Sequence, residues 1–240
     1  MNNIEFTKKE YNKYGAEYHK ELLNSKSGFW HKYLEKPAMT SLLKPIVKNK
    51  IVLDLGCGSG IYTKKLNSFG AQVKGLDLSK SLIEIAKKEN SKINFFVGDA
   101  KKTPFDNSQF DIVSSSLMVH YFKKLVPLFK EVSRILKKKG IFVFSITHPI
   151  NEVITKKDNL FKFTDYFHRR KYGWEMQSGM KVKNYHHTFE DIVNSLNDSG
   201  FIIERVLEKK PPLSSKKINL PAYKKASICP SSLIIKAKKE

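Results

Sequence analysis

Three glycines at alternate positions form the part of the sequence whose spacing most directly indicates chemistry. They are Gly56, Gly58 and Gly60, in the run IVLDLGCGSG at residues 51–60. A turn without side chains lets the backbone approach a ligand, and a helix start just behind it favours a nucleotide-like group. A dinucleotide fingerprint places its third glycine five residues after the first, and that position is Ile61. The GxGxG spacing therefore predicts a nucleoside site that departs from the NAD pattern.

Two aspartates follow the next two apolar runs. Asp77 lies about twenty residues beyond the turn, where a carboxylate at a strand end can accept hydrogen bonds from both hydroxyls of a ribose. Asp99, in VGDA at 97–100, can meet the amine and ring edge of adenine. Either aspartate alone is more often a turn residue or a helix cap. Their order behind the glycine turn predicts that three strand ends converge on one nucleoside.

The chain resembles the class I S-adenosylmethionine (SAM) dependent methyltransferases, in the subgroup of small-molecule and ubiquinone-biosynthesis-like enzymes. The matching segments cover most of the chain in a fixed order: VLDLGCGSG (52–60), GLDLS (75–79), VGDA (97–100), FDIVSSSLMVHYF (110–122), ILKKKGIFVFSITHP (135–149), YHHTFEDIVNSLNDSGF (185–201) and the closing SSLIIKAK. The resemblance implies a Rossmann-like fold, SAM as the cofactor and S-adenosyl-L-homocysteine as its product.

The resemblance also assigns roles to the motif positions. The glycine turn with its preceding aspartate would hold the methionine end of SAM, the two later aspartates with their neighbours would bind ribose and adenine, and two serines would flank the transferred methyl group. Two N-terminal tyrosines in YNKYGAEY would close over the cofactor, with ordinary packing as the alternative. The expected cofactor-binding residues are Tyr11, Tyr18, Asp54, Gly56, Cys57 (through its backbone), Gly58, Gly60, Asp77, Leu78, Gly98, Asp99, Ala100, Ser115 and Ser116.

Methyl transfer from SAM demands little of a protein beyond aligning the acceptor and excluding water, because the sulfonium already carries an activated methyl group. A base is needed only where the acceptor is protonated. His120 follows the fourth expected strand, and an imidazole has a suitable unperturbed pKa. We therefore expect His120 to act as a base or substrate contact, with a packed structural histidine as the alternative. Further candidates are His148, His186 and His187, and no HxxH or DxD spacing predicts a metal site.

The elements that must position these residues follow from the hydrophobic pattern. Runs rich in β-branched residues alternate with helical-period segments, as in repeated βα units. We expect strands at 51–55, 71–76, 93–97, 110–115, 141–146, 201–207 and 231–237. We expect helices at 60–69, 79–90, 121–137, more weakly at the 101–107 turn region, and from the capping box TFED (188–191) to DSG (198–200), with a long loop at 209–230. The predicted fold is α/β: a Rossmann-like, seven-stranded, mostly parallel sheet with helices on both faces, an antiparallel last strand and an N-terminal helical cap.

We expect a single methyltransferase domain over residues 1–240. Residues 1–45 would form the helical cap, residues 46–146 the SAM-binding core, and residues 188–240 the C-terminal helix and strand pair. Residues 147–187 are rich in aromatic side chains without a clear period. We expect them to form an insertion on the substrate side of the sheet, where open α/β folds bind ligands.

The charge of the chain leaves the class of methyl acceptor open. The sequence has 44 Lys and Arg against 23 Asp and Glu, a formal net charge of +21, and clustered basic residues would favour a phosphate-rich partner. Nearly all of this charge is lysine scattered along the chain, whereas nucleic-acid sites favour arginine. We therefore interpret it mainly as a solvated surface and expect a small-molecule acceptor. An RNA or protein methyltransferase and a non-catalytic SAM-binding protein remain the alternatives.

The location follows from what the sequence lacks. Neither a signal peptide nor a membrane helix is expected, because no apolar stretch has the required length. The two cysteines are too few for a disulfide scaffold, which fits a reducing compartment. We expect a cytoplasmic monomer or homodimer without a membrane partner.

Overall fold

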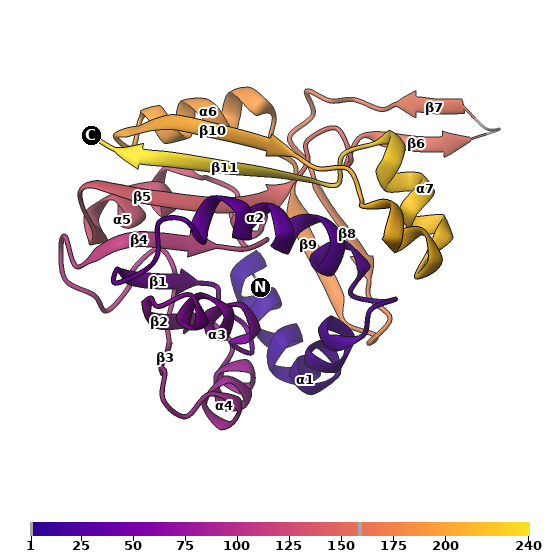
Figure 1. Ribbon diagram of the computed structural model, residues 1–240. Helices are drawn as coiled ribbons and strands as arrows, with labels where there is room; N and C mark the ends of the chain where they lie inside the picture. The colour runs from indigo at the N-terminus through magenta and orange to yellow at the C-terminus, as the bar shows by residue number, and fades with distance from the viewer. Residues whose placement is uncertain (1, 158–159) are drawn as a thin grey trace.

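A seven-stranded sheet organises the chain, and the computed structural model describes residues 2–157 and 160–240. The strands are β1 (Ile51–Leu55), β2 (Gln72–Asp77), β3 (Asn94–Val97), β4 (Phe110–Ser115), β5 (Leu136–Thr147), β10 (Phe201–Glu208) and β11 (Ser232–Lys239). Their order is β3-β2-β1-β4-β5-β11-β10 (Figure 1). Only the last strand, β11, runs antiparallel to its two neighbours, and the remaining pairs are parallel. The predicted sheet is confirmed.

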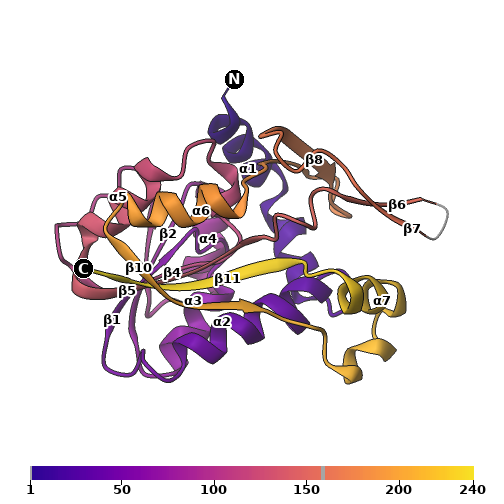
Figure 2. The same ribbon diagram turned by 90° about the horizontal axis from the view of Figure 1, so that it is seen from above.

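Helices cover both faces of this sheet (Figure 2). One face is packed by α2 (Lys36–Leu43) and α3 (Ile61–Ser68), and the other by α5 (Val126–Ile135) and α6 (Phe189–Asn197). Successive side chains of a strand point to opposite faces, so Val52 packs in the first layer and Leu53 in the second. A strand buried on both faces needs a continuous apolar run, which β1 supplies on either side of Asp54.

The N-terminal segment lies across the carboxyl ends of the parallel strands. It consists of α1 (Asn3–Leu23), a five-residue π-helical turn η1 (His31–Glu35), and α2. In Figure 1 the arrowheads of β1, β4 and β5 point toward the side on which α1 lies. The helix α1 packs on α4 (Lys80–Glu89) at Gly15, where an added Cβ would come 2.5 Å from Ser81 Oγ. Asn12 Oδ1 also accepts a hydrogen bond of 2.9 Å from Ser79 Oγ, the side chain that caps α4.

The aromatic-rich segment after β5 forms strands that the sequence did not predict. β6 (Ile154–Lys157) pairs with β7 (Leu160–Phe163), and β8 (Lys171–Glu175) pairs with β9 (Lys181–Tyr185), both antiparallel. The second pair supports α1, because Asn3 Nδ2 donates to the carbonyls of Lys183 (3.0 Å) and Tyr121 (3.1 Å). Short strands with mixed aromatic and basic residues carry too few alternations to be recognised.

Three predicted boundaries were wrong, each for a local reason. The expected loop at 209–230 contains η3 (Leu213–Lys217) and α7 (Leu220–Ile228), which begins where Asn219 Oδ1 accepts from Ala222 N at 3.1 Å. The helix expected at 121–137 is replaced by a 3-10 turn η2 (Val119–Tyr121) and the shorter α5, because the lysine-rich end of that segment is already the start of β5. The weakly expected helix at 101–107 is irregular chain.

No helix within the described ranges is both long enough and apolar enough to cross a bilayer.

Candidate active site

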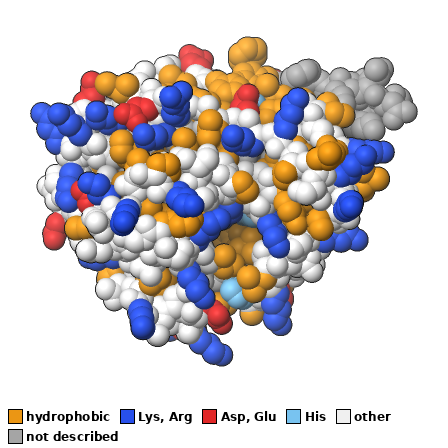
Figure 3. All heavy atoms as spheres, in the orientation of Figure 1, with side chains coloured by type: hydrophobic (Ala, Val, Ile, Leu, Met, Phe, Trp, Pro, Cys, Tyr) orange, Lys and Arg blue, Asp and Glu red, His pale blue; other side chains and the backbone are white. Residues whose placement is uncertain are grey.

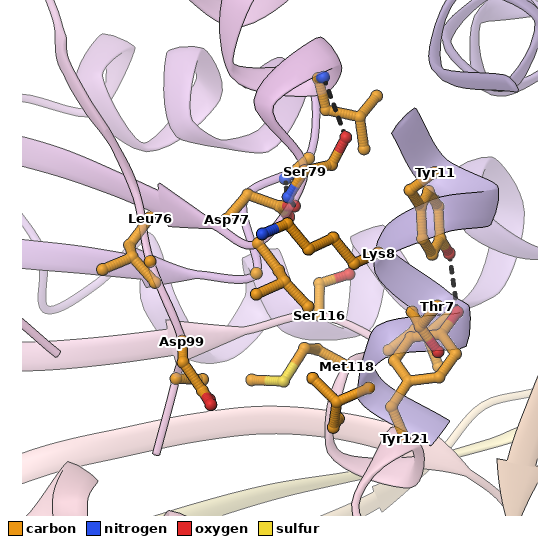
Figure 4. Close-up of a pocket in the computed structure, with 18 of the residues that line it drawn as sticks. Thr7, Lys8, Tyr11, Leu76, Asp77, Ser79, Asp99, Ser116, Met118 and Tyr121 are labelled. Atoms are coloured by element: carbon orange, nitrogen blue, oxygen red, sulfur yellow. Dashed lines mark hydrogen bonds between the residues drawn. The ribbon is translucent and has the colours of Figure 1, made fainter. Parts of the chain in front are cut away.

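Two adjoining cavities open at the carboxyl edge of the sheet. The first cavity lies between α1, the ends of β2 and β3, and the chain after β4 (Figure 4). The second cavity, about 320 Å³ in volume, lies between the end of α1, η1, α2, the end of β1 and α3. Both are lined by Tyr18, Gly56, Gly58 and Ser116, so these residues form their common wall. On the face shown in Figure 3, hydrophobic side chains lie in a central hollow with a histidine beside it.

The glycine turn lines this common wall with backbone. Gly56, Gly58 and Gly60 have φ angles of 76°, 55° and 77°, which side chains disfavour. A Cβ on Gly58 would meet only Leu82, at 4.0 Å, and would otherwise project into the open cavity. This is the fit that a bulky nucleoside cofactor requires. Gly60 has a packing role instead. It lines neither cavity, and its missing Cβ leaves room for the ring of Phe95.

Asp77 stands at the edge of the first cavity, as the sequence predicted. Its Oδ2 accepts from Gly58 N and its Oδ1 from Ser79 N, both at 2.8 Å. Burial raises the pKa of this carboxyl, although these backbone donors oppose the shift. Each carboxylate oxygen has a further lone pair for a ligand hydroxyl. Figure 4 shows the Lys8 side chain of α1 pointing toward this strand end.

The other end of the first cavity carries the residues expected around adenine. Gly98, Asp99 and Ala100 line it after β3, together with Leu78 after β2. Asp99 Oδ1 accepts from Lys101 N at 2.9 Å, which holds the carboxylate at the turn. The structure thus brings these predicted residues to one cavity.

Asp54 lines the second cavity from the end of β1. Its Oδ2 accepts from Thr63 Oγ1 at 2.6 Å, and the side chain is almost fully buried. Burial raises the pKa of Asp54 to about 6, against the opposing charge of Lys36. The neighbouring Cys57 has its thiol pKa raised by burial, so the thiol stays neutral. Asp54 thus supplies a carboxylate, and Cys57 supplies backbone polar groups, at one point of the wall of the second cavity.

Ser115 and Ser116 have different positions. Ser116 lines both cavities, donates from Oγ to Glu35 Oε1 at 2.9 Å, and accepts from Lys36 Nζ at 2.6 Å. Ser115 is fully buried and lines neither cavity. Only Ser116 therefore faces the place where both predicted serines were expected.

The predicted tyrosines of α1 cover the first cavity. The hydroxyls of Tyr11 and Tyr121 lie 2.7 Å apart (Figure 4), and the ring centroids of Tyr11 and Tyr18 are 5.1 Å apart in an edge-to-face arrangement. Burial raises the pKa of both Tyr11 and Tyr18, so their hydroxyls are neutral. The helix thus presents an uncharged aromatic wall to the site.

His120 lies close to the site but outside the residues that line the two cavities. Its Nδ1 is 3.1 Å from Thr147 Oγ1, and the side chain is 4% exposed. Burial, and then the charges of His187 and His31, lower the pKa of His120 to about 3. The other candidates are also engaged: His148 with Glu208, His186 with Glu152, and His187 with the Phe122 carbonyl.

Three residues of the site were not predicted from the sequence. His31 and Lys36 line the second cavity, and Glu35 lies buried behind them. They occur in HKYLEKP, which carries no recognisable spacing. Glu35 Oε1 is held by Ser116 and by Ser145 at 2.7 Å, residues 81 and 110 positions away. A buried carboxylate defined by such distant partners has no local signal.

Comparisons with known proteins agree with this geometry. A family model described as a methyltransferase domain matches residues 53–144. An uncharacterized protein of Haemophilus influenzae is 32% identical over 227 residues, covering 86% of this chain and 87% of that protein. The ubiquinone biosynthesis O-methyltransferase of Pelagibacter ubique is 36% identical over 102 residues, which cover 41% of this chain and 42% of that enzyme.

A solved structure gives the same result over most of the chain. The S-adenosylmethionine dependent methyltransferase from Mesorhizobium loti superposes with a TM-score of 0.73 and 28% identity, covering 85% of this chain and 97% of that one. With the sheet order and the glycine turn described above, these matches decide the family. The chain belongs to the class I SAM-dependent methyltransferases and is an enzyme that uses SAM as its cofactor.

Proposed function

We propose that this enzyme moves the methyl group of SAM to an oxygen, nitrogen or carbon atom of a small, partly apolar metabolite. When bound, SAM supplies a methyl group on a sulfonium, which an acceptor lone pair takes by in-line displacement. The observation that carries the proposal is the common wall of the two cavities. In this proposal the nucleoside lies on one side of the wall, and the amino acid and a small acceptor lie on the other.

The cofactor contacts follow the predicted assignment. We propose that Asp77 and Leu78 contact the ribose, and that Gly98, Asp99 and Ala100 surround the adenine, since all five line the first cavity. Asp54 and the backbone of the glycine turn would hold the ammonium end of the methionine part. Tyr11 and Tyr18 would cover the cofactor from α1.

Lys36 completes this set in our proposal, as the partner of the methionine carboxylate. Its ammonium is held by Ser116, lies 3.7 Å from Glu35 Oε2 and 4.2 Å from the centroid of the Tyr62 ring, and faces the same cavity as Asp54. A cation and an anion on one wall complement the two charges of an amino acid.

Calorimetry with a matched series of ligands tests these assignments. We expect SAM to bind with a dissociation constant on the order of micromolar, and Asp77→Ala to weaken binding about 100-fold, because hydrogen bonds to a charged group are lost. Lys36→Met should weaken SAM about tenfold or more while leaving decarboxylated SAM and 5′-methylthioadenosine unchanged, since neither carries the carboxylate.

The control for charge alone is Lys80→Met, on the exposed surface of α4. An equal loss for all three ligands in Lys36→Met would show that Lys36 acts on the fold and not on the carboxylate. Folded wild-type protein that binds none of the three ligands would contradict the cofactor site.

Two of the four arginines, the residue type that nucleic-acid sites favour, make contacts within the chain. Arg169 pairs with Asp191 at 2.9 Å, and Arg170 is 3.4 Å from Thr164 Oγ1. On the face shown in Figure 3 the basic side chains are dispersed and form no stripe. These observations support a small acceptor over a nucleic acid. Within this proposal the enzyme is cytoplasmic, acts as a monomer or homodimer, and keeps Cys57 and Cys229 as free thiols.

A further inference from the structure

His31 and Glu35 form a pair at the second cavity that the cofactor contacts leave unused. His31 lines this cavity and is 23% exposed, whereas Glu35 is 1% exposed and lies behind it. The two residues bound the π-helical turn η1, in which Lys36 N donates to His31 O. Turns of this kind are uncommon and are frequent at functional sites. The turn places Glu35 next to Ser116, which follows β4, and Ser145 of β5.

One oxygen of Glu35 is held firmly and the other is not. Oε1 accepts from Ser116 Oγ at 2.9 Å and from Ser145 Oγ at 2.7 Å. Oε2 lies 3.7 Å from Lys36 Nζ and 3.8 Å from His31 Nδ1, beyond hydrogen-bond distance of either. Within the described residues, Oε2 and His31 Nδ1 are both buried atoms without a hydrogen-bond partner. A shift of about 1 Å would join these two atoms and satisfy both.

The orientation of His31 follows from this arrangement. Nδ1 is buried, so the exposed part of the His31 side chain lies away from this atom, in a residue that lines the cavity. A hydrogen bond from Nδ1–H to the Glu35 carboxylate would fix the tautomer in which Nε2 is unprotonated. The pair then has the arrangement of a base held in place by a carboxylate.

We propose that His31 is the general base for the methyl acceptor and that Glu35 is the residue that positions it. The inference rests on the proposed function and adds the class of acceptor: one whose reacting oxygen or nitrogen still carries a proton, such as a hydroxyl or an amine. Every bond formed and broken in the proton and methyl transfers is then accounted for within the site. The acceptor proton goes to His31 Nε2, and the acceptor lone pair forms the bond to the methyl carbon. The bond between carbon and sulfur breaks with its electron pair on sulfur.

The charges around His31 fit this role. Glu35 faces it from the same turn, Lys36 from the start of α2, Asp54 from β1, and His120 from the chain after β4, while Lys32 and Lys65 stand at the cavity. Although burial raises it, the pKa of Glu35 is lowered to about 2 by Lys36 and by His31, so its carboxylate is charged at neutral pH. A fixed negative charge next to the imidazole stabilises the imidazolium that proton uptake produces.

His120 is the competing base, and the structure separates the two candidates. His120 is almost fully buried, and no carboxylate is among the causes that shift its pKa to about 3. His31 has the cavity on one side and a carboxylate on the other. Only His31 therefore combines access to an acceptor with a partner for the transferred proton.

Histidine NMR tests the pair without requiring a known acceptor. Protein labelled with 15N at histidine is titrated in complex with S-adenosyl-L-homocysteine, and the signal of His31 is identified by its loss in His31→Gln. We expect the neutral ring to carry its proton on Nδ1. In Glu35→Gln an amide donor would face Nδ1 in place of the carboxylate oxygen, so the proton should move to Nε2. The matched control is Glu190→Gln, at an exposed carboxylate far from the cavity. A proton on Nε2 in the neutral ring of the wild type, or a proton position that Glu35→Gln leaves unchanged, would overturn the proposal.

Glu35→Gln keeps an oxygen that can accept from Ser116 and Ser145, so we expect this variant to fold. Its binding of S-adenosyl-L-homocysteine checks this. If it does not fold, Glu35→Asp serves instead, because it keeps the charge but withdraws it from His31. The fraction of neutral His31 rings with the proton on Nε2 should then rise less than in Glu35→Gln.

Methyl transfer supplies the second readout. The probe is SAM with a labelled methyl group, offered to the small-molecule fraction of a bacterial extract. We expect His31→Gln to slow transfer about 100-fold or more while the affinity for S-adenosyl-L-homocysteine stays within about twofold. Glu35→Gln should also slow transfer while the affinity for S-adenosyl-L-homocysteine is retained. The control His168→Gln changes an exposed histidine outside the site.

The outcomes separate this inference from the function beneath it. Normal transfer by His31→Gln with loss in His120→Gln would assign the base to His120 and overturn the proposal. Wild-type protein that binds the product but transfers no label at any pH would contradict both the proposed function and the base.

Discussion

At the scale of single residues, the site pairs buried charges with specific partners. Asp54 is the clearest case, because it is almost fully buried at the end of β1 and, among the described residues, only Thr63 donates a hydrogen bond to its carboxylate, at 2.6 Å. An ionised carboxylate there is costly until a cation arrives. The ammonium of the bound methionine part would supply that cation. Asp54 would therefore lower the stability of the free protein and raise its affinity for SAM.

We predict that Asp54→Asn stabilises the free protein in a pH-dependent way. The folded-state pKa of about 6 lies above the unfolded value of about 3.9. The protonated carboxyl therefore makes its full contribution to the free energy of unfolding below the pKa of the unfolded state. This contribution is lost as the pH rises through the folded-state pKa of about 6. At pH 8 the ionised group costs up to ~3 kcal/mol. Urea unfolding at pH 4 and pH 8 should show Asp54→Asn gaining stability at the higher pH while losing SAM affinity.

Asp106→Asn, at an exposed carboxyl, is the matched control and should leave the pH dependence of unfolding unchanged. An Asp54→Asn protein whose unfolding free energy follows the wild type at both pH values would contradict the buried, raised carboxyl.

At the scale of elements, α1 determines whether the first cavity is closed. It is held by Gly15 against α4, by Asn12 at the cap of α4, and by a 2.8 Å contact between His19 Nδ1 and Ser59 Oγ in the glycine turn. β9 supports the helix from outside through Asn3. Residues 147–187 line neither of the two cavities within the described chain, so their contribution to acceptor binding stays a prediction.

We predict that Gly15→Ala loosens α1 although it makes the isolated helix more stable. Alanine favours a helix over glycine by about 1 kcal/mol, but its Cβ would lie 2.5 Å from Ser81 Oγ and separate α1 from α4. Hydrogen exchange in α1 should become faster. S-adenosyl-L-homocysteine should bind about tenfold more weakly, because molecules in which α1 is detached from α4 must first order this helix before they bind.

Ser81→Ala removes the clashing oxygen, so the double variant should recover both the protection and the affinity. Glu17→Ala, on the exposed side of the same helix, should change neither. Slow exchange in Gly15→Ala would show that α1 does not depend on this contact.

At the scale of the whole molecule, the excess of positive charge acts on stability. The net charge is +21, and the ion pairs of the described residues, such as Lys137 with Asp111 and Lys236 with Glu204, neutralise few of the 44 basic residues. Like charges spread over a folded surface repel one another, and salt screens this repulsion over about 10 Å at 0.1 M.

We predict that the melting temperature rises by a few degrees between about 0.05 and 0.5 M potassium chloride, because screening relieves this repulsion. Differential scanning fluorimetry measures the shift, and binding of an RNA oligonucleotide should be absent at about 150 mM salt. An RNA-modifying enzyme would instead bind RNA with a steep dependence on salt. A melting temperature unaffected by chloride would show that the charge is balanced locally.

The sequence by itself determined the sheet and which strand-end residues meet at the first cavity. Glycine spacing and the aspartates at successive strand ends are local patterns, and parallel strands bring their carboxyl ends to one edge whatever lies between them. Strand β4 and the cap at Thr188 were predicted to the residue for the same reason. The cofactor roles given to individual residues remain predictions, and binding of the ligand series will test them.

Only the tertiary structure decided which polar residues meet at the second cavity. It separated Ser116, at the wall, from Ser115, in the core, because neighbouring strand-end residues face opposite ways. It also brought Glu35 to Ser145 and left His31 facing the cavity instead of His120. Such a cluster has no sequence signal, since burial and partners come from segments more than eighty residues apart that meet only when the sheet and its N-terminal helices have packed.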